Sequence, residues 1–292
     1  MGVRKILFPT KFEELSLEAV RSLYGLREAG FEEIVFLHVI ERSEVAFNLT
    51  TGFDRELAEQ MREDALLRFK EWEKEVQAEG FPARCRVEVG NPAPKILQVA
   101  CEEQVDLIVV GRHRPLLSDD LYLGGEMMEV LRLSPKPVMV WRGVADASRP
   151  LFSRILFPTD FSKVSERAYD FIKDIMHSVS RIDIVHLLPR NEFSGKSPAE
   201  VNAQVEGTFD LMEGIKVDLA TAGVDSFTHI YAGDPVKEIL SVVGEYGSTA
   251  IVMGTTGKGS VSEFFAGSVS HEIAEKSPVA VILVPDEKKL CE

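Results

Sequence analysis

Short apolar runs alternate with longer amphipathic stretches along the whole chain. In the first half, the apolar runs have strand length and the amphipathic stretches repeat their apolar residues at helical spacing. The pattern predicts strands over 5–9, 33–40, 83–89, 106–110 and 137–141, and helices over 16–29, 55–78, 93–103 and 126–133. Strands that alternate with helices indicate right-handed crossovers and a parallel sheet covered by helices on both faces.

The second half of the chain repeats the first. Residues 4–12 recur as 153–161, and residues 90–92, 106–111 and 134–140 recur 143 positions later as 233–235, 249–254 and 277–283. A repeat that keeps order and spacing over a whole unit predicts two copies of one fold. We therefore expect modules at 1–143 and 153–292, a linker at 144–152, and a second long helix over 198–222.

Two strand ends in the second copy carry unusual residues. The strand at 155–157 leads into Pro158, Thr159 and Asp160, and the strand at 250–253 leads into Gly254. Ligands of open parallel sheets bind at the carboxyl ends of strands, where the strand order reverses. If these two strands are neighbours, Asp160 and the loop after Gly254 face one crevice.

The loop after Gly254 is rich in glycine and ends where a short helix is predicted, at Ser268. Glycine lets backbone N–H groups approach a ligand closely, and a helix start presents unpaired N–H groups that suit phosphate. The alternative interpretation is a solvated loop whose Ser268 caps the helix.

The net charge and the cysteines indicate which ligands and which cellular compartment the protein is suited to. A formal net charge of −14 argues against a nucleic-acid or anionic-membrane partner, because both require basic surfaces. It leaves room for one small phosphate ligand held by backbone dipoles. The three cysteines lie at no metal-binding spacing and are expected to be thiols of a reducing cytoplasm. No apolar run approaches the ~20 residues of a membrane span.

These features together resemble the universal stress protein family. The resemblance rests on Ile-Leu-Phe-Pro-Thr-Asp-Phe-Ser at 155–162, Val-Met-Gly at 252–254, Ser-Pro-Val-Ala-Val-Ile-Leu-Val at 277–284, and the Gly-x2-Gly-x9-Gly-Ser spacing from Gly254 to Ser268. It covers nearly the whole chain as two tandem modules. It implies Rossmann-like modules of five parallel strands, whose last strands, 138–141 and 281–284, would pair as an internal pseudo-dimer. A homodimer is possible, and any protein partner is unknown.

The family resemblance also implies a nucleotide site, with ATP, ADP or AMP as ligand and a divalent ion such as Mg²⁺ on the phosphates. Gly257, Gly267 and Ser268 would hold phosphates, and Val269 would continue the helix start. Met253 and Gly254 would lie under the ribose, and Asp160 would accept hydrogen bonds from ribose or adenine. Pro158 and Thr159 would wall the adenine pocket, and the backbone of Leu187 would read the adenine edge. Lys258 and Ser260 are additional phosphate contacts that the loop suggests.

The first copy departs from this pattern. Arg114 replaces the second glycine of the motif, Gly125 replaces its serine, and Lys11 stands where the second copy has Asp160. Asp119 and Asp120 would repel a polyphosphate. The sequence predicts a degenerate first site that serves structure or a partner; the alternative is an anion site built from Lys11, Arg112, His113 and Arg114.

No catalytic or metal-binding motif stands out in the chain. His38 and His186 occupy matching strand positions in both copies, so packing explains them better than catalysis. The leading hypothesis is a stress-response protein for which the nucleotide is a bound signal. The alternatives are a slow ATPase, for which Glu263 is the only carboxylate in the loop, and an interaction module that binds no nucleotide. An electron-transfer flavoprotein-like module is a remote alternative from architecture alone.

Overall fold

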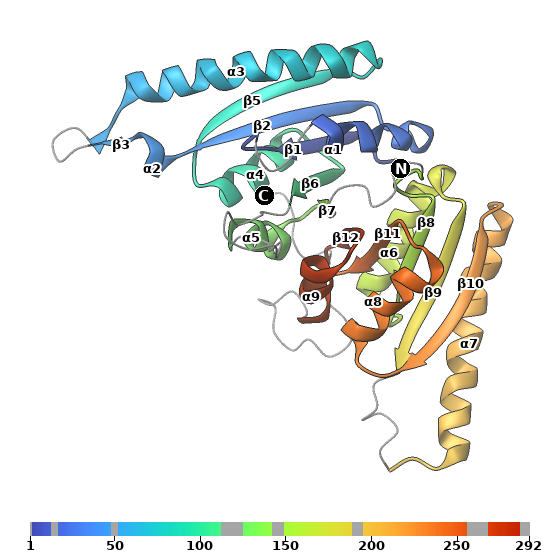
Figure 1. Ribbon diagram of the computed structural model, residues 1–292. Coiled ribbons are helices and arrows are strands. Elements are labelled where there is room, and N and C mark those ends of the chain that lie inside the picture. The colour runs from blue at the N-terminus through green and yellow to red at the C-terminus, as the bar shows by residue number, and fades with distance from the viewer. Residues whose placement is uncertain are drawn as a thin grey trace. The chain divides into compact units, whose positions relative to one another are not determined.

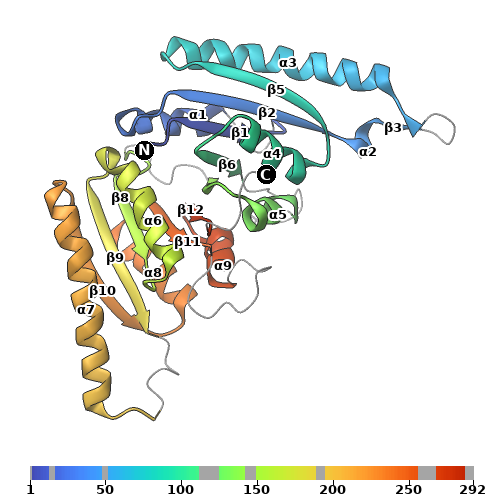
Figure 2. The same cartoon turned by 180° about the vertical axis from the view of Figure 1, so that it is seen from behind.

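The structure is a computed structural model that describes residues 2–12, 17–47, 52–111, 125–141, 149–188, 195–255 and 268–286. The chain divides into two compact units, Gly2–Trp141 and Arg142–Asp286. Each unit is an α/β module whose central strands are all parallel, as the sequence predicts. Figures 1 and 2 show the elements of both units from two sides.

The first module has five central strands in the order β7-β6-β1-β2-β5. Its elements are β1 (Lys5–Pro9), α1 (Leu17–Ser22), a 3-10 helix (Leu23–Ala29), β2 (Glu33–Glu41), α2 (Arg42–Val45), β3 (Ala46–Phe47), β4 (Gly52–Phe53), α3 (Arg55–Ala78), β5 (Ala83–Gly90), α4 (Pro92–Glu102), β6 (Leu107–Gly111), α5 (Gly125–Leu133) and β7 (Val138–Trp141). Helices α3 and α4 cover opposite faces of this sheet (Figure 1).

The second module has the same strand plan, in the order β10-β9-β8-β11-β12. Its elements are β8 (Arg154–Pro158), α6 (Lys163–Asp174), a 3-10 helix (Met176–Ser178), β9 (Arg181–Leu188), α7 (Pro198–Thr221), β10 (Asp225–Ala232), α8 (Pro235–Tyr246), β11 (Ala250–Gly254), α9 (Ser268–Lys276) and β12 (Ala280–Val284). Figure 2 shows α6 and α7 on one face of the sheet, with α8 and α9 behind it. The Tyr169 hydroxyl joins α6 to α7 by donating to Asp218 Oδ2 at 2.8 Å.

The central strands form the core of each module. Every residue of β6, β11 and β12 is buried. Such continuous apolar strands are typical of parallel sheets that are covered on both faces. The side chains of Leu151 and Phe152, which the sequence places in the linker, are also buried, with 7% and 2% exposure.

Local signals at the helix ends explain where the long helices begin. The Asp54 side chain accepts a hydrogen bond from Leu57 N, and α3 spans the predicted range 55–78. Ser197 and Glu200 form a reciprocal capping box at the start of α7. The helix expected over 16–29 is different: α1 ends at Ser22 and a 3-10 helix follows.

The expectation of three unpaired thiols is wrong for one cysteine. Cys85 is a free thiol, whereas Cys101 is disulfide-bonded. The sequence argument failed because an odd count still allows one pair, and spacing along the chain does not set distance in the fold. No helix among the described residues is long and apolar enough to cross a bilayer.

Candidate functional site

The second module reverses its strand order between β8 and β11. After β8, the chain adds β9 and then β10 on one side; it then returns to place β11 on the other side of β8. The register pairs Ala250 with Ile155 and Ile251 with Leu156. The expectation that these two strands are neighbours is confirmed. Their carboxyl ends flank the position where open parallel sheets bind ligands.

The turn after β8 is fixed by contacts with β9. Thr159 N donates to the Val185 carbonyl at 2.9 Å, and His186 Nδ1 donates to the Thr159 carbonyl at 2.8 Å. Phe161 has a φ of 55°, in the left-handed region, and its N–H donates to Thr159 Oγ1. The rings of Phe161 and His186 pack 5.0 Å apart. These contacts support the structural interpretation of His186.

The Asp160 carboxylate is held in one orientation by the start of α6. Asp160 Oδ1 accepts from Ser165 Oγ at 2.6 Å and from Ser162 N at 3.1 Å. Ser162 is also the N-cap of α6, and Ser165 is buried with 5% exposure. Hydrogen bonds to a charged group are stronger than neutral ones, and a helix N-terminus favours a negative charge. Neither serine was among the predicted site residues, although a serine two positions after a strand-end aspartate is a signal for a helix cap.

Gly254 lies where α6 comes closest to the end of β11. A Cβ atom on Gly254 would stand 2.7 Å from Val164 Cγ1 and 3.1 Å from the Val164 backbone carbon. The next residue, Thr255, donates its N–H to the Val284 carbonyl, and its own carbonyl accepts from Ser270 Oγ of α9 at 2.7 Å. Close packing within the fold is therefore a sufficient reason for glycine at this position.

The described part of the predicted nucleotide site gathers at three adjacent strand ends. Pro158 and Thr159 are buried, Asp160 and Leu187 are half-buried, and Met253 is 8% exposed. Ser268 is the first residue of α9, and Val269 follows it, half-buried. Gly257, Gly267, Lys258, Ser260 and Glu263 lie outside the described residues.

The first module repeats the turn after its first strand, but a lysine replaces the aspartate of that turn. Phe12 has a φ of 69°, and His38 Nδ1 donates to the Thr10 carbonyl at 2.9 Å, as at the matching positions of the second module. Lys11 replaces the aspartate, and its Nζ lies 2.5 Å from Glu41 Oε1 and 3.8 Å from Glu126 Oε2. Two carboxylates beside this ammonium group lower the local positive potential, so it attracts an anion less strongly.

A cavity of about 240 Å³ lies at the carboxyl ends of β1 and β6 in the first module. Its lining combines the strand ends with the start of α5: Pro9, Thr10, Lys11, Leu37, Val39, Pro92, Ile96, Gly111, Gly125, Glu126 and Met127. Glu126 stands where the second module has Val269. In the second module this helix start is the predicted phosphate site. In the first module the same position carries a carboxylate, which would repel phosphate. Arg112, His113, Arg114, Asp119 and Asp120 lie outside the described residues.

Comparisons with known proteins agree with the two-module organisation. The model of the universal stress protein family matches residues 2–142 and 151–285. A universal stress protein of Methanocaldococcus jannaschii is 30% identical over 151 residues, which are 47% of this chain and 93% of that protein. A crystal structure of a universal stress protein from Archaeoglobus fulgidus has 25% identity and a TM-score of 0.74, covering 99% of this chain and 98% of that one. A protein of unknown function from Pseudomonas aeruginosa shares the fold at 16% identity and a TM-score of 0.63, with 98% and 94% coverage.

Proposed function

Because this chain belongs to the universal stress protein family, we propose that its second module binds an adenine nucleotide and acts in stress-response signalling. The observation that carries the proposal is Asp160, a carboxylate fixed by Ser162 and Ser165 at the reversal of strand order. A carboxylate held in advance accepts hydrogen bonds from a ligand without a new ordering cost.

Each part of the nucleotide has a matching part of the site. Asp160 accepts hydrogen bonds from ribose or adenine, with Pro158 and Thr159 as the wall of the adenine pocket. The Leu187 backbone reads the adenine edge, and Met253 and Gly254 lie under the ribose.

The phosphates belong to the loop and to the start of α9. Gly257 and Gly267 contribute backbone N–H groups, and Ser268 and Val269 open a nine-residue helix whose N-terminus favours anions. Mg²⁺ would sit on the phosphates of ATP or ADP and needs no dedicated protein cage there. The bound nucleotide would act as a signal by stabilising one conformation of the loop.

The proposal assigns nucleotide binding to one module of the two, 153–292, and a structural or partner-binding role to module 1–143. The pairing of Lys11 with Glu41 and Glu126 supports this division. It also places the protein in the cytoplasm, where adenine nucleotides are the signal to be read.

The deciding experiment counts nucleotide per chain. The purified protein is denatured, and the released nucleotide is identified and quantified by chromatography and mass spectrometry, before and after loading with MgATP. We expect one adenine nucleotide per chain. Two per chain would contradict the degenerate first site, and none after loading would leave a module that binds no nucleotide.

Asp160→Ala tests the site itself. We expect ATP affinity to fall by roughly 10- to 150-fold, since hydrogen bonds to a charged group contribute about 1.5–3 kcal/mol. Lys11→Ala is the matched control at the same position of the first module, and it should leave ATP affinity unchanged. Titration calorimetry measures both variants. If Asp160→Ala bound ATP with full affinity, Asp160 would not contact the ribose or the adenine.

A further inference from the structure

The outer strands β5 and β10 occupy the same place in their modules. Among the residues that the structure describes, β5 pairs only with β2 and β10 only with β9. An outer strand presents alternate N–H and C=O groups that can pair with another chain, and proteins commonly guard such an edge with charged side chains.

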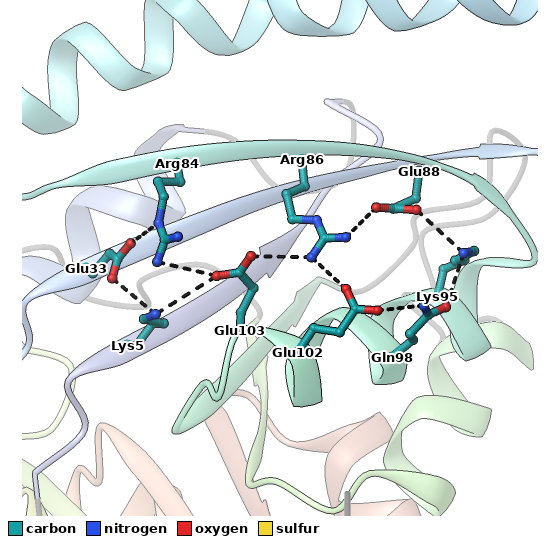
Figure 3. A network of polar contacts seen from close by, with 9 residues as sticks. All are labelled: Lys5, Glu33, Arg84, Arg86, Glu88, Lys95, Gln98, Glu102 and Glu103. Atoms are coloured by element: carbon teal, nitrogen blue, oxygen red, sulfur yellow. Dashed lines mark hydrogen bonds and ion pairs between the residues drawn. The ribbon is translucent and has the colours of Figure 1, made fainter. Parts of the chain in front are cut away.

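β5 is guarded in this way. Arg84 pairs with Glu33 and Glu103, and Arg86 pairs with Glu88, Glu102 and Glu103. Figure 3 shows these pairs as one network along one side of β5, with Lys5, Glu33, Arg84, Arg86, Glu88, Lys95, Gln98, Glu102 and Glu103 as its members. A strand that docked here would have to bury or displace charges, so the network disfavours pairing.

β10 carries no such guard. The positions of Arg84, Arg86 and Glu88 hold Phe227, His229 and Tyr231, and no Asp, Glu, Lys or Arg occurs from 226 to 232. The strand is rich in the β-branched and aromatic residues that favour strands. Its Phe227 side chain is 45% exposed. A long, uncharged outer strand of this composition is a template for strand pairing.

Two paired side chains of the neighbouring strand β9 contact these aromatic rings. Asp183, with a side chain 1% exposed, accepts from Arg181 Nε and Nη2 at 2.8 and 2.7 Å, and lies 3.0 Å from His229 Nε2. The Arg181 guanidinium stacks over Phe227 at 4.2 Å. The Arg181 and Asp183 side chains are 27% and 1% exposed, so they present less charged surface to a docking strand than Arg84 of β5, which is 54% exposed.

Helix α8 supports the other end of the aromatic row. The Tyr246 ring stacks on His229 at 4.4 Å, and its hydroxyl is hydrogen-bonded to the Tyr231 hydroxyl at 2.7 Å. Side chains that are already ordered lose little freedom when a partner binds. Within the described part of the chain, the outer edge of β10 is thus both unpaired by another strand and pre-organised.

We propose that β10 pairs with β10 of a second copy of this chain, antiparallel and about a two-fold axis through His229. A two-fold interface must be self-complementary, and this register meets that condition. Phe227 then lies opposite Tyr231 of the second copy, and Thr228 lies opposite Ile230. Aromatic and β-branched residues form favourable cross-strand pairs. Asp225 lies opposite Gly233, so no two carboxylates face each other.

The net charge of the chain favours this edge over other surfaces. Two copies with a formal charge of −14 each repel one another generally. Contact is least costly where the surface is uncharged, and the 226–232 stretch is such a surface. The same argument disfavours β5, whose charges would be desolvated.

The double variant Phe227→Arg/His229→Arg tests the proposal on the full chain. It copies Arg84 and Arg86 of the guarded strand, and it brings the new guanidinium groups at position 229 of the two copies together on the axis. We expect concentration-dependent dimers of the wild type by sedimentation velocity, and self-association on the order of a hundredfold weaker in the variant, because like charges placed together cost several kcal/mol. A monomeric wild type across the dilution series would overturn the proposal.

Leu211→Arg/Val217→Arg is the matched control, with the same added charge on α7 of the same module. Both residues are exposed, at 55% and 63%. This control should dimerise like the wild type; dissociation by both variants, or by neither, would refute pairing at β10. Circular dichroism checks that each variant is folded.

Hydrogen exchange supplies a second test without any substitution. In the wild type, β10 amides should exchange more slowly at high than at low protein concentration, whereas β5 amides should not change. Equal exchange of β10 at both concentrations would also overturn the proposal.

Discussion

Adding a single methyl group at Gly254 should destabilise the second module. In Gly254→Ala the new Cβ would stand 2.7 Å from Val164 Cγ1 and 3.1 Å from the Val164 backbone carbon. The first contact can be relieved by a side-chain shift, but the second requires α6 to move away from β11. Because α6 also carries Ser165, that movement would loosen the clamp on Asp160.

The expected cost follows from two opposing effects. Overpacking of a core typically costs about 1–3 kcal/mol. Replacing glycine with alanine recovers about 0.4–1 kcal/mol by restricting the unfolded chain. The balance is a net loss of stability on the order of 1–2 kcal/mol.

Gly233→Ala is the matched control because the substitution is the same and the neighbour differs. Its Cβ would stand 2.5 Å from Glu238 Oε1, and its other near contacts are also with the Glu238 side chain. The half-buried Glu238 carboxylate ends a flexible side chain, so it can rotate away from the new Cβ at a small cost in free energy. We expect Gly233→Ala to lie within about 0.5–1 kcal/mol of the wild type, on the stabilising side if the entropic effect dominates.

The distribution of tryptophan makes the assay specific. Both tryptophans, Trp72 and Trp141, lie in the first module, so their fluorescence reports its unfolding alone, whereas far-ultraviolet circular dichroism reports both modules. In urea, Gly254→Ala should lower the midpoint of the dichroism transition that fluorescence does not see.

Two results would refute this reasoning. If Gly254→Ala were as stable as Gly233→Ala, contact with the Val164 backbone would not be what requires glycine. If Val164→Ala fully restored the stability of Gly254→Ala, the clash would be with the side chain only, and α6 would not need to move.

Two further predictions concern titratable groups of the first module. Burial alone would raise the pKa of Glu33, but its ion pairs with Arg84 and Lys5 outweigh burial and lower that pKa. The ionised pair therefore stabilises the module fully above the unfolded-state pKa of roughly 4.3, and this stability is lost as pH falls through the lower folded pKa. In Arg84→Met, the free energy of unfolding measured by fluorescence should fall less steeply with decreasing pH in this range. An unchanged pH dependence would contradict the prediction. Burial and then the hydrogen bond to Glu73 raise the pKa of the Cys85 thiol, so iodoacetamide at neutral pH should label Cys85 only after unfolding, as peptide mass spectrometry would show.

Most of the fold could be predicted from the sequence because the pattern occurs twice. The range of α3 was predicted at both ends from its amphipathic pattern, and the Asp54 cap fixes its start. The helix over 16–29 was not, because Ser22 Oγ donates to the Ala19 carbonyl and accepts from Trp141 Nε1, 119 positions away. A distant partner of this kind leaves no periodic signal. β3 and β4 were missed for another reason, because two residues each are too few to show an alternating pattern.

Of the site, the sequence could predict the pair of strands but not the contacts around Asp160. The rule for reversed strand order correctly made β8 and β11 neighbours. The roles of Ser162 and Ser165 depend on the turn at Phe161, whose positive φ is uncommon for a large side chain. The close approach of Val164 likewise depends on the position of α6, which no local pattern encodes.

The two modules serve as controls for each other, since they share one fold within one chain. The bond from histidine to the threonine carbonyl occurs in both, as His38 with Thr10 and His186 with Thr159, so it belongs to the fold and not to a ligand. What differs must serve something that the modules do not share. Two of the differences, in the crevice and in the outer strand, concern surface charge, and both leave the second module with fewer charges paired within the chain. In the first module charges are paired within the chain, whereas in the second the crevice holds an oriented carboxylate and the outer strand is uncharged. Internal pairing of charges disfavours binding by a surface, so these differences support the proposal that the second module, and not the first, binds the ligand and the partner.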